Sequence, residues 1–362
     1  MGDFVEEKRT TVKDIAARLN ISLSTVNKAL TGKPGISEKR RAEVLSTAKE
    51  MGYVVNHVAQ SLSRKPVRMG VIIPSVWKQY FDLVECGIKI QFEKLAQENV
   101  QGFFRYIQNG SDIQGALEFF YEKNIDIIIY CPSLIEVPEK VGLDLRRRNI
   151  PVFVVGDECR EIDSVCSVVI NTELSGRMAA DFLRLFLNEG DRVAVFTGSM
   201  GIGAHAEKAE AFGSRARELS LVSAGIYETF DDRETAKACV AEMLAGFPDV
   251  KGIYVATAIA AAVTEYFEER PDIARPYIIA TDIYEDIRRE MANGRIAAAI
   301  YQNQVLLGRL AIKMAYRYLV GITSYNALEE EFSRKICVNP HLFLPSNVEN
   351  LIHDNGNDYT LA

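Results

Sequence analysis

Four side chains near the N-terminus have the chemical types and the spacing of a surface that reads DNA. Leu23, Ser24, Asn27 and Lys28 fall on one side of a predicted helix, and Val26 falls on the other. Hydroxyl, amide and ammonium groups on an exposed helix can form hydrogen bonds with base edges in a major groove. The segment is therefore predicted to be the second helix of a helix-turn-helix.

Three short helices are expected to position that surface. Thr11 and Asp14 indicate a capping box at the start of the first helix. Asn20 tolerates the left-handed conformation of a tight turn, and Ser22 and Ser37 can begin the second and third helices. The predicted miniature core consists of the inward-facing apolar residues Ile15, Ala16, Leu19, Val26, Ala29, Leu30, Val44, Leu45, Ala48 and Met51. An ordinary three-helix cap on a larger domain would have the same spacing.

The charge distribution favours DNA binding over a plain helical cap. Residues 1–65 contain twelve Lys and Arg against seven Asp and Glu, although the whole chain has a net charge of −7. A basic head on an acidic body attracts the phosphate backbone through one small domain and keeps the rest of the chain off the DNA.

Behind the head, strands alternate with amphipathic helical stretches. The predicted strands form two series, 68–73, 102–107, 126–130 and 151–155, then 165–170, 192–197, 222–229, 252–256 and 277–281. Two such series indicate two doubly wound lobes with parallel sheets, and residues 296–300 and 303–320 are expected to cross back to the first lobe. Ligands bind such sheets at the carboxyl ends of the strands, so the cleft between the lobes is the expected site.

The composition is that of a soluble globular protein, with 48% hydrophobic and 25% charged residues. No apolar run is long enough to span a bilayer, and no signal peptide precedes the head. The six cysteines form no CxxC pair, which predicts reduced thiols and a cytoplasmic location. The four histidines are scattered, so we expect neither a metal site nor a cofactor.

One further motif suggests a different chemistry. The segment TGSMGIGAHA places Gly201, Gly203 and Ala206 in the GxGxxA pattern of a dinucleotide-binding loop, and Glu228 lies at the end of the next strand. An NAD-dependent oxidoreductase is therefore the alternative from another functional class. Against it, the first glycine lies several residues beyond the strand, and the sequence contains no recognisable constellation with a catalytic His or Tyr.

A long run of the head resembles the LacI/GalR family of bacterial transcription regulators, namely VKDIAARLNISLSTVNKALTGKPGISEKRRAEVLSTAKEMGY. The resemblance implies that Leu23, Ser24 and Lys28 read bases, and that Thr25 and Asn27 lie nearer the phosphates. Where the family commonly has Ser-Arg, this chain has Asn27 and Lys28, so a bidentate contact of Arg with guanine becomes a single-point contact of Lys.

The same resemblance continues into a hinge at residues 56–66. A helix of eight residues from Asn56 to Ser63 is too short to be stable alone in water, so it is expected to order only when something packs on it. The family implies that two such helices pair in a dimer and enter the minor groove, where Leu62 acts as a wedge. Asn56 and Leu62 are therefore predicted DNA contacts, Gln60 replaces the usual Arg, and a plain linker is the alternative.

The body resembles the periplasmic-binding-protein-like effector domain of that family, from about Arg68 to Leu344. Matching positions imply an effector site made of Tyr80, Phe81, Asn171, Lys208, Asp282 and Gln302. Asn171 stands where the family usually has Asp, and Lys208 where it usually has Arg. Such groups suit a polyhydroxylated ligand, because each desolvated hydroxyl needs a donor and an acceptor. Tyr80 and Phe81 are also consistent with core positions, and Asp282 with the cap of a helix at 284–291.

Together these patterns predict an all-α helix-turn-helix head at 1–55, the hinge at 56–66, an α/β body at 67–345 and a loose tail at 346–362. The first lobe is expected at about 67–164 and 297–328, and the second at about 165–296 and 329–345. The resemblance implies a non-enzymatic, homodimeric repressor that binds a pseudo-palindromic operator and responds to a small, sugar-like effector in the cleft. A regulator controlled by a protein partner is the alternative within the same class.

Overall fold

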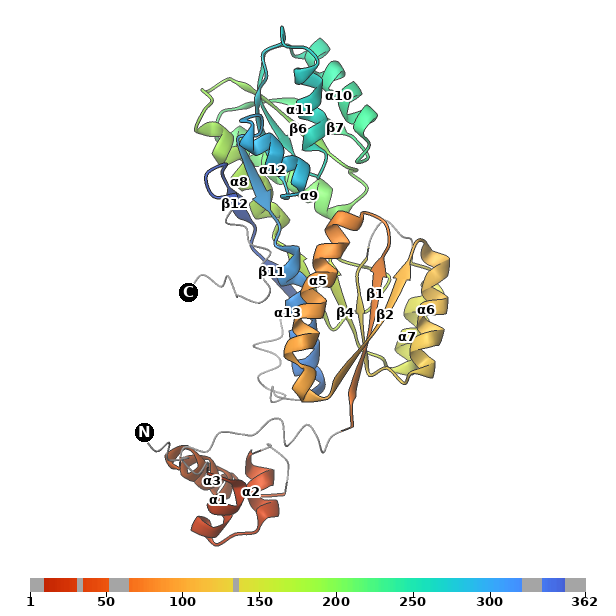
Figure 1. Cartoon of the computed structure of the whole chain (residues 1–362), viewed down its shortest axis with the longest axis vertical. Coiled ribbons are helices and arrows are strands. Elements are labelled where there is room, and N and C mark those ends of the chain that lie inside the picture. The colour runs from red at the N-terminus through yellow and green to blue at the C-terminus, as the bar shows by residue number, and fades with distance from the viewer. Residues whose placement is uncertain (1–9, 31–34, 52–64, 133–136, 321–333, 349–362) are drawn as a thin grey trace, which may run out of the picture.

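The computed structural model describes residues 10–30, 35–51, 65–132, 137–320 and 334–348. These residues form a helical head and two α/β lobes (Figure 1). The predicted DNA contacts Asn56 and Leu62, most of the predicted hinge and most of the predicted tail lie outside the described residues. In the ranges that the structure describes, no helix is long and apolar enough to cross a membrane.

The head consists of three helices, α1 (Val12–Leu19), α2 (Leu23–Leu30) and α3 (Glu38–Glu50). The capping box of Thr11 and Asp14 is confirmed, because each side chain bonds the other residue's backbone. Asn20 adopts the left-handed conformation, with φ 51°, and ends α1. This short turn sets α2 against α1 and α3.

The predicted core of the head needs one correction. Ile15, Val26 and Val44 are fully buried, as expected from their spacing. Leu45, however, is 46% exposed, and the neighbouring Thr47 is buried on the inward face of α3. The helical positions three and four residues apart from Val44 place Thr47 and Ala48 inside, so Leu45 turns toward solvent.

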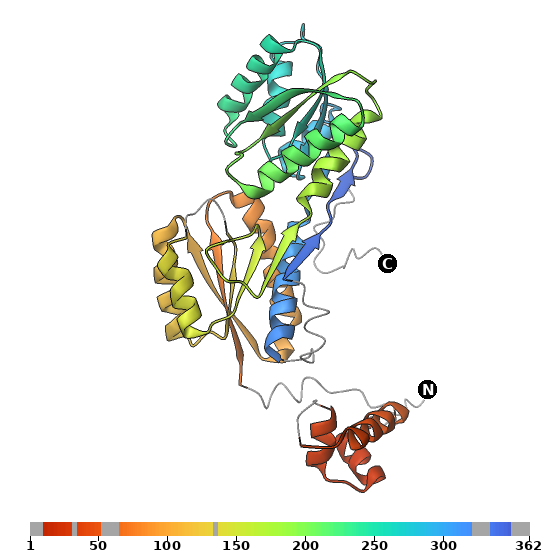
Figure 2. The ribbon, with the colours of Figure 1, turned by 180° about the vertical axis from the view of Figure 1, so that it is seen from behind.

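The first lobe is built on a six-stranded parallel sheet in the order β11-β5-β4-β3-β1-β2. Its strands are β1 (Val67–Pro74), β2 (Val100–Ile107), β3 (Ile127–Tyr130), β4 (Val152–Gly156), β5 (Cys166–Ile170) and β11 (Lys335–Val338). Helices α6 (Gly110–Glu122) and α7 (Glu139–Arg148) cover one face. Helices α5 (Lys78–Lys94), followed by the short η1 (Ala96–Glu98), and α13 (Gln304–Val320) cover the other (Figures 1 and 2).

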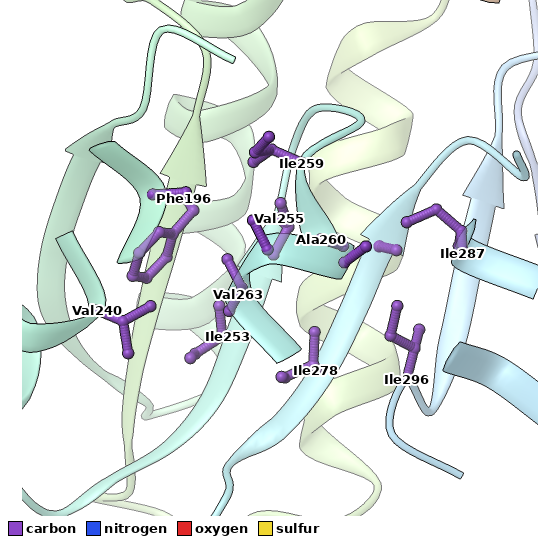
Figure 3. Packing of buried hydrophobic residues seen from close by; sticks show 14 of the residues in the cluster. Phe196, Val240, Ile253, Val255, Ile259, Ala260, Val263, Ile278, Ile287 and Ile296 are labelled. Atoms are coloured by element: carbon purple, nitrogen blue, oxygen red, sulfur yellow. The ribbon is translucent and has the colours of Figure 1, made fainter. Parts of the chain in front are cut away.

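The second lobe repeats this plan with the order β12-β10-β9-β8-β6-β7, in which only the β10–β12 pair is antiparallel. Its strands are β6 (Arg192–Thr197), β7 (Val222–Glu228), β8 (Val250–Val255), β9 (Tyr277–Thr281), β10 (Ala298–Tyr301) and β12 (His341–Phe343). One face packs on α8 (Thr172–Arg184) and α9 (Gly203–Glu218). The other packs on α10 (Arg233–Gly246), α11 (Ala260–Glu268) and α12 (Glu285–Ala292), where aliphatic side chains such as Val255, Val263 and Ile278 interlock (Figure 3).

The strand pairing corrects the predicted lobe boundaries at three strands. Strand β5 pairs with β4 and therefore belongs to the first lobe, although residues 165–170 were expected to open the second. Strand β10 pairs with β9 in the second lobe, so the chain returns to the first lobe only with α13. Strand β11 pairs with β5 in the first lobe, although residues 329–345 were expected in the second. These apolar strands look alike in sequence, and only their partners decide the lobe to which each belongs.

Glycines allow pairs of helices to cross at close range. A Cβ on Gly308 of α13 would lie 2.1 Å from the Val84 carbonyl oxygen of α5, and one on Gly87 would lie 2.0 Å from the Val305 carbonyl oxygen. In the second lobe, a Cβ on Gly176 of α8 would lie 2.3 Å from the Lys208 carbonyl oxygen of α9. Backbone contact at these points leaves no room for a side chain and fixes where α9 and α13 lie.

Candidate functional site

Polar side chains follow the carboxyl ends of strands from both sheets. Asp157 follows β4 of the first lobe, and Asp231, Thr257, Asp282 and Gln302 follow strands of the second. A cavity of about 380 Å³ lies between the lobes at this level. Its lining includes Asp157 and Glu161 from the first lobe and Gly203 and Glu207 from the second. We call this region the interlobe cleft.

Asp282 is the most fully bonded group of the cleft. It has a left-handed backbone, with φ 65°, and is only 3% exposed. Gln304 Nε2 donates to Oδ1 at 2.6 Å and Gln302 Nε2 donates to Oδ2 at 2.8 Å. The Gln302 backbone N–H and the Tyr284 hydroxyl donate more weakly, at 3.4 and 3.3 Å. A carboxylate has about four acceptor positions, so the protein itself fills those of Asp282.

The alternative role of Asp282 as a helix cap does not describe this geometry. The N-cap residue of α12 is Tyr284, and its side chain makes no capping hydrogen bond. Burial raises the pKa of Asp282, whereas the Lys208 ammonium and the Gln304 and Gln302 amides favour its ionised form. The carboxylate instead ties β9 to the segment that enters α13.

Lys208 brings a buried positive charge to the cleft. Its side chain is only 2% exposed, and its single hydrogen bond within the described ranges goes to Gln302 Oε1 at 3.4 Å. An ammonium group has three donors, so two are left for a ligand. Burial lowers the pKa of Lys208, and Asp282, Asp231 and Asp157 act against that shift.

The remaining predicted effector residues separate into three environments. Tyr80 reaches the cleft, since burial and then Asp282 and Asp157 raise the pKa of its phenol. Phe81 is buried in the core of the first lobe, edge-on to Tyr80 with ring centroids 5.1 Å apart. Asn171 caps α8 by accepting from the Leu174 N–H at 3.1 Å, and its amide donates to Asn339. The structure therefore groups Tyr80 with Lys208, Asp282 and Gln302, and places Phe81 and Asn171 in structural contacts.

Two residues that sequence reasoning missed have unusual backbone conformations. Phe230 and Asp231 follow β7 with φ angles of 52° and 55°, which non-glycine residues rarely adopt in succession. Hydrogen bonds hold the turn, because Phe230 N donates to the Gly198 carbonyl at 2.7 Å and Thr229 Oγ1 donates to the Thr197 carbonyl at 2.9 Å. Phe230 is 64% exposed. Strained positions held in this way are common at binding sites, and the signal in the sequence was only two aspartates, Asp231 and Asp232, shortly after a strand.

His205 and Thr257 also escaped the sequence analysis. His205 lies on the first turn of α9, and its Nδ1 accepts from the Ser199 N–H at 3.2 Å. Burial, assisted by the Lys208 charge, lowers the pKa of His205 to about 3, so the imidazole is neutral near pH 7. Thr257 is 5% exposed, and its hydroxyl interacts with Asp231 without forming a hydrogen bond of good geometry among the described residues. A single histidine or threonine in an apolar context carries no pattern that points to a cleft.

The GxGxxA segment forms a loop closed by the chain itself. Glu228 Oε1 accepts from the Met200 N–H at 2.6 Å and from the Ser199 hydroxyl at 3.4 Å. In a dinucleotide-binding loop, the corresponding acidic residue binds a ribose and the backbone N–H groups face a pyrophosphate. Here the acidic side chain occupies the loop. Nor do the described residues contain a group of three His, Cys, Asp or Glu that could hold a metal ion.

The predicted base-reading side chains share one side of α2. Leu23, Ser24 and Asn27 are exposed, whereas Thr25 and Lys28 are half-buried. Thr25 Oγ1 lies 2.8 Å from Ser22 Oγ and so stiffens the first turn of the helix. An eight-residue helix with an exposed outer face of this kind can enter a major groove.

Comparison with known families gives two matches along the chain. Residues 11–56 match the family described as "Bacterial regulatory proteins, lacI family", and residues 69–323 match the "Periplasmic binding protein domain". The second match covers most of the body, including the interlobe cleft.

Individual relatives are more distant. The chain is 25% identical over 200 residues to catabolite control protein A of Streptococcus mutans serotype c, which covers 52% of this chain and about half, 55%, of that protein. It is 23% identical over 330 residues to the ribose operon repressor of Bacillus subtilis, which covers 88% of this chain and 94% of that protein. A solute-binding protein of Burkholderia graminis, solved with D-arabinose, has the same fold, with a TM-score of 0.66 and 21% identity over 78% of this chain and 96% of that one.

Proposed function

Because the chain belongs to the lacI family of bacterial regulatory proteins and is a DNA-binding transcriptional regulator with an effector-binding domain, we propose that it is a repressor controlled by a small, sugar-like ligand. The ligand binds in the interlobe cleft, and a homodimer binds a pseudo-palindromic operator. The family is not enzymatic, so the dinucleotide-dependent oxidoreductase is no longer an alternative.

The observation that carries the proposal is the arrangement around Lys208. A buried ammonium with two unused donors lies near carboxylates from both lobes, at the carboxyl ends of two sheets. The neighbouring Thr257 hydroxyl and Asp231 carboxylate, which lack hydrogen bonds of good geometry among the described residues, complete a set that suits a polyol, because a hydroxyl both donates and accepts. Since the cleft is lined by both lobes, a ligand there favours one relative placement of the lobes over another.

Base recognition is assigned to α2. Leu23, Ser24 and Lys28 contact bases, and Thr25 and Asn27 contact the phosphate backbone. In the dimer the two heads lie in successive major grooves, which requires half-sites about one helical turn apart.

Replacing Lys28 tests this assignment. On DNA selected from a random pool by the full chain, Lys28→Ala should weaken binding by about 1–3 kcal/mol and relax the base preference at one position of each half-site. Lys251→Ala is the matched control, because it removes one exposed lysine from β8 of the second lobe. Fluorescence anisotropy on selected and scrambled DNA measures both effects. An equal loss on both DNAs would reduce Lys28 to a phosphate contact.

A further inference from the structure

The cleft contains more negative charge than the protein neutralises. Three carboxylates, those of Asp282, Asp231 and Asp157, act on the single Lys208 ammonium. His205, next to Lys208 in the cleft, is neutral near pH 7 and adds no positive charge. A largely buried group of charges with a surplus of negative charge favours a ligand that brings a positive one.

The three carboxylates differ in what they can still accept. Asp282 has donors at all of its acceptor positions, as described above. Asp157 accepts the Glu158 N–H at 2.8 Å and lines the cavity. Asp231 Oδ1 is buried, and it has no hydrogen-bond partner among the described residues. The unused acceptor capacity of the cleft therefore lies at Asp231 and, to a smaller extent, at Asp157.

Thr257 lies beside Asp231. It is only 5% exposed and its hydroxyl interacts with the Asp231 carboxyl group, but neither that hydroxyl nor Asp231 Oδ1 has a hydrogen bond of good geometry within the described ranges. Asp231 also approaches His205, because a Cβ on Gly198 would lie 2.7 Å from His205 Cε1 and 2.8 Å from Asp231 Oδ2. Buried oxygens left open in pairs are costly unless a ligand or water fills the gap.

The wall of the adjoining cavity, which Asp157 also lines, is acidic. Glu158, Glu161 and Glu207 line it together with Asp157, against Arg160 and Lys335. Lys335 is already paired with Glu158 at 2.9 Å, and Glu207 accepts from the Thr172 hydroxyl. A negatively charged ligand such as a sugar phosphate or a sugar acid would meet this surplus of carboxylates, so the wall selects against it.

We propose that the effector is an amine-bearing polyol, such as an amino sugar, whose ammonium group pairs with Asp231 while Lys208 donates to its hydroxyls. Asp157 supplies further negative charge from the opposite lobe, so the cation attracts both lobes to itself. This inference rests on the proposed function, because it specifies the chemistry of the ligand in the same cleft. Burial raises the pKa of Asp231 and of Asp157, and a bound cation would offset that cost.

Matched ligands test the contribution of the ammonium group separately from that of the sugar hydroxyls. The probes are glucosamine, galactosamine and mannosamine, each compared with its parent hexose and its N-acetyl derivative, which keep the hydroxyls and lose the cation. Isothermal titration of the full chain at constant ionic strength measures each affinity. At least one amine is expected to bind about tenfold more tightly than both of its neutral counterparts, which corresponds to about 1.4 kcal/mol.

Two variants test whether Asp231 causes the preference for the amine. Asp231→Asn should abolish the preference for the amine, because it keeps the shape and removes the charge, and asparagine tolerates the left-handed backbone at this position. Asp249→Asn is the control, since it removes an exposed carboxylate just before β8, where it pairs with Arg192. Melting of Asp231→Asn at or above the temperature of the parent chain would show that the variant folds.

The outcomes distinguish the proposed function from the cationic nature of the effector. Neutral sugars that bind as tightly as the amines would overturn the cationic effector and leave the proposed function standing. Undiminished amine preference in Asp231→Asn would overturn the role of Asp231. Failure of every probe to bind at millimolar concentration would contradict the sugar-like effector itself, and the present inference with it.

Discussion

Asp282 and Asp231 follow strands of the same sheet, and both have left-handed backbones, yet they differ in what they offer a ligand. The four donors around Asp282 make it the group that orients Gln302 and Gln304. Asp231 keeps an open oxygen beside Thr257. The resemblance pointed to Asp282, because position in a sequence motif does not reveal how many hydrogen bonds a side chain has already made.

His205 gives the folded chain a defined sensitivity to acid. Its pKa is lowered from 6.5 to about 3 in the folded state, so between these values the unfolded chain binds a proton that the folded chain does not. The free energy of unfolding should therefore fall as the pH falls below 6.5. We expect His205 to account for about 1–2 kcal/mol of the loss between pH 7 and pH 5.

Urea denaturation at the two pH values measures this contribution. His205→Asn should show a smaller decrease of the unfolding free energy than the parent chain, whereas His341→Asn, on β12 of the same lobe, provides the control. Identical decreases in the parent chain and in His205→Asn would contradict a buried, neutral imidazole.

At the scale of elements, the chain passes from the second lobe into the first through α13, which packs on α5 in the core of the first lobe. The backbone contact between Gly308 and Val84 leaves no space for a methyl group, since a Cβ there would also lie 2.8 Å from the Ile88 nitrogen. The segment from Gln302 to Gln304, which holds Asp282, leads directly into α13. A shift of α13 against α5 is therefore expected to disturb the cleft.

Gly308→Ala should destabilise the body by about 1–3 kcal/mol, because overpacking forces the two helices apart. The matched control is Gly115→Ala on α6, where nothing lies within 4 Å of the new methyl group. That substitution should be neutral or stabilise by up to about 1 kcal/mol through helix propensity. Thermal melting of both variants provides the comparison, and equal effects would contradict the close crossing.

Periodicity was sufficient to find the elements and insufficient to assign them. The strands predicted at 192–197 and 277–281 have the same bounds as β6 and β9, and the strand predicted at 68–73 differs from β1 by one residue at each end. The strands β5, β10 and β11 were assigned to the wrong lobes, because sequence order says nothing about which edge a strand joins when the chain crosses three times. The expectation that Leu45 lies in the core of the head is wrong for a similar reason, since hydrophobicity alone does not determine on which face of α3 a residue lies.

In the cleft, sequence resemblance located the region and the structure supplied the chemistry. Tyr80, Lys208, Asp282 and Gln302 converge as the family pattern implies, although their contacts with an effector remain a prediction. The strained turn at Phe230 could not be foreseen, because its conformation depends on bonds to the neighbouring strand β6.

At the scale of the whole molecule, the account is one of linkage between two sites. The proposed DNA-reading face lies on α2, and the cleft lies between lobes that the chain joins by three crossings. A ligand that attracts carboxylates of both lobes favours one arrangement of the lobes, and it changes operator affinity only if that arrangement differs in its preference for DNA. The size of the response is therefore the difference between two affinities and does not depend on how tightly the ligand binds.

The most direct test of this linkage is the operator affinity of the full chain, measured by fluorescence anisotropy with and without a saturating amino sugar that binds the cleft. The account predicts that the dissociation constant changes by a factor of about 5 to 150, the usual range of allosteric coupling. It also predicts that Lys208→Met, which removes the buried ammonium of the cleft, abolishes the change and keeps DNA binding. An operator affinity that stays the same when the cleft is saturated would contradict the account.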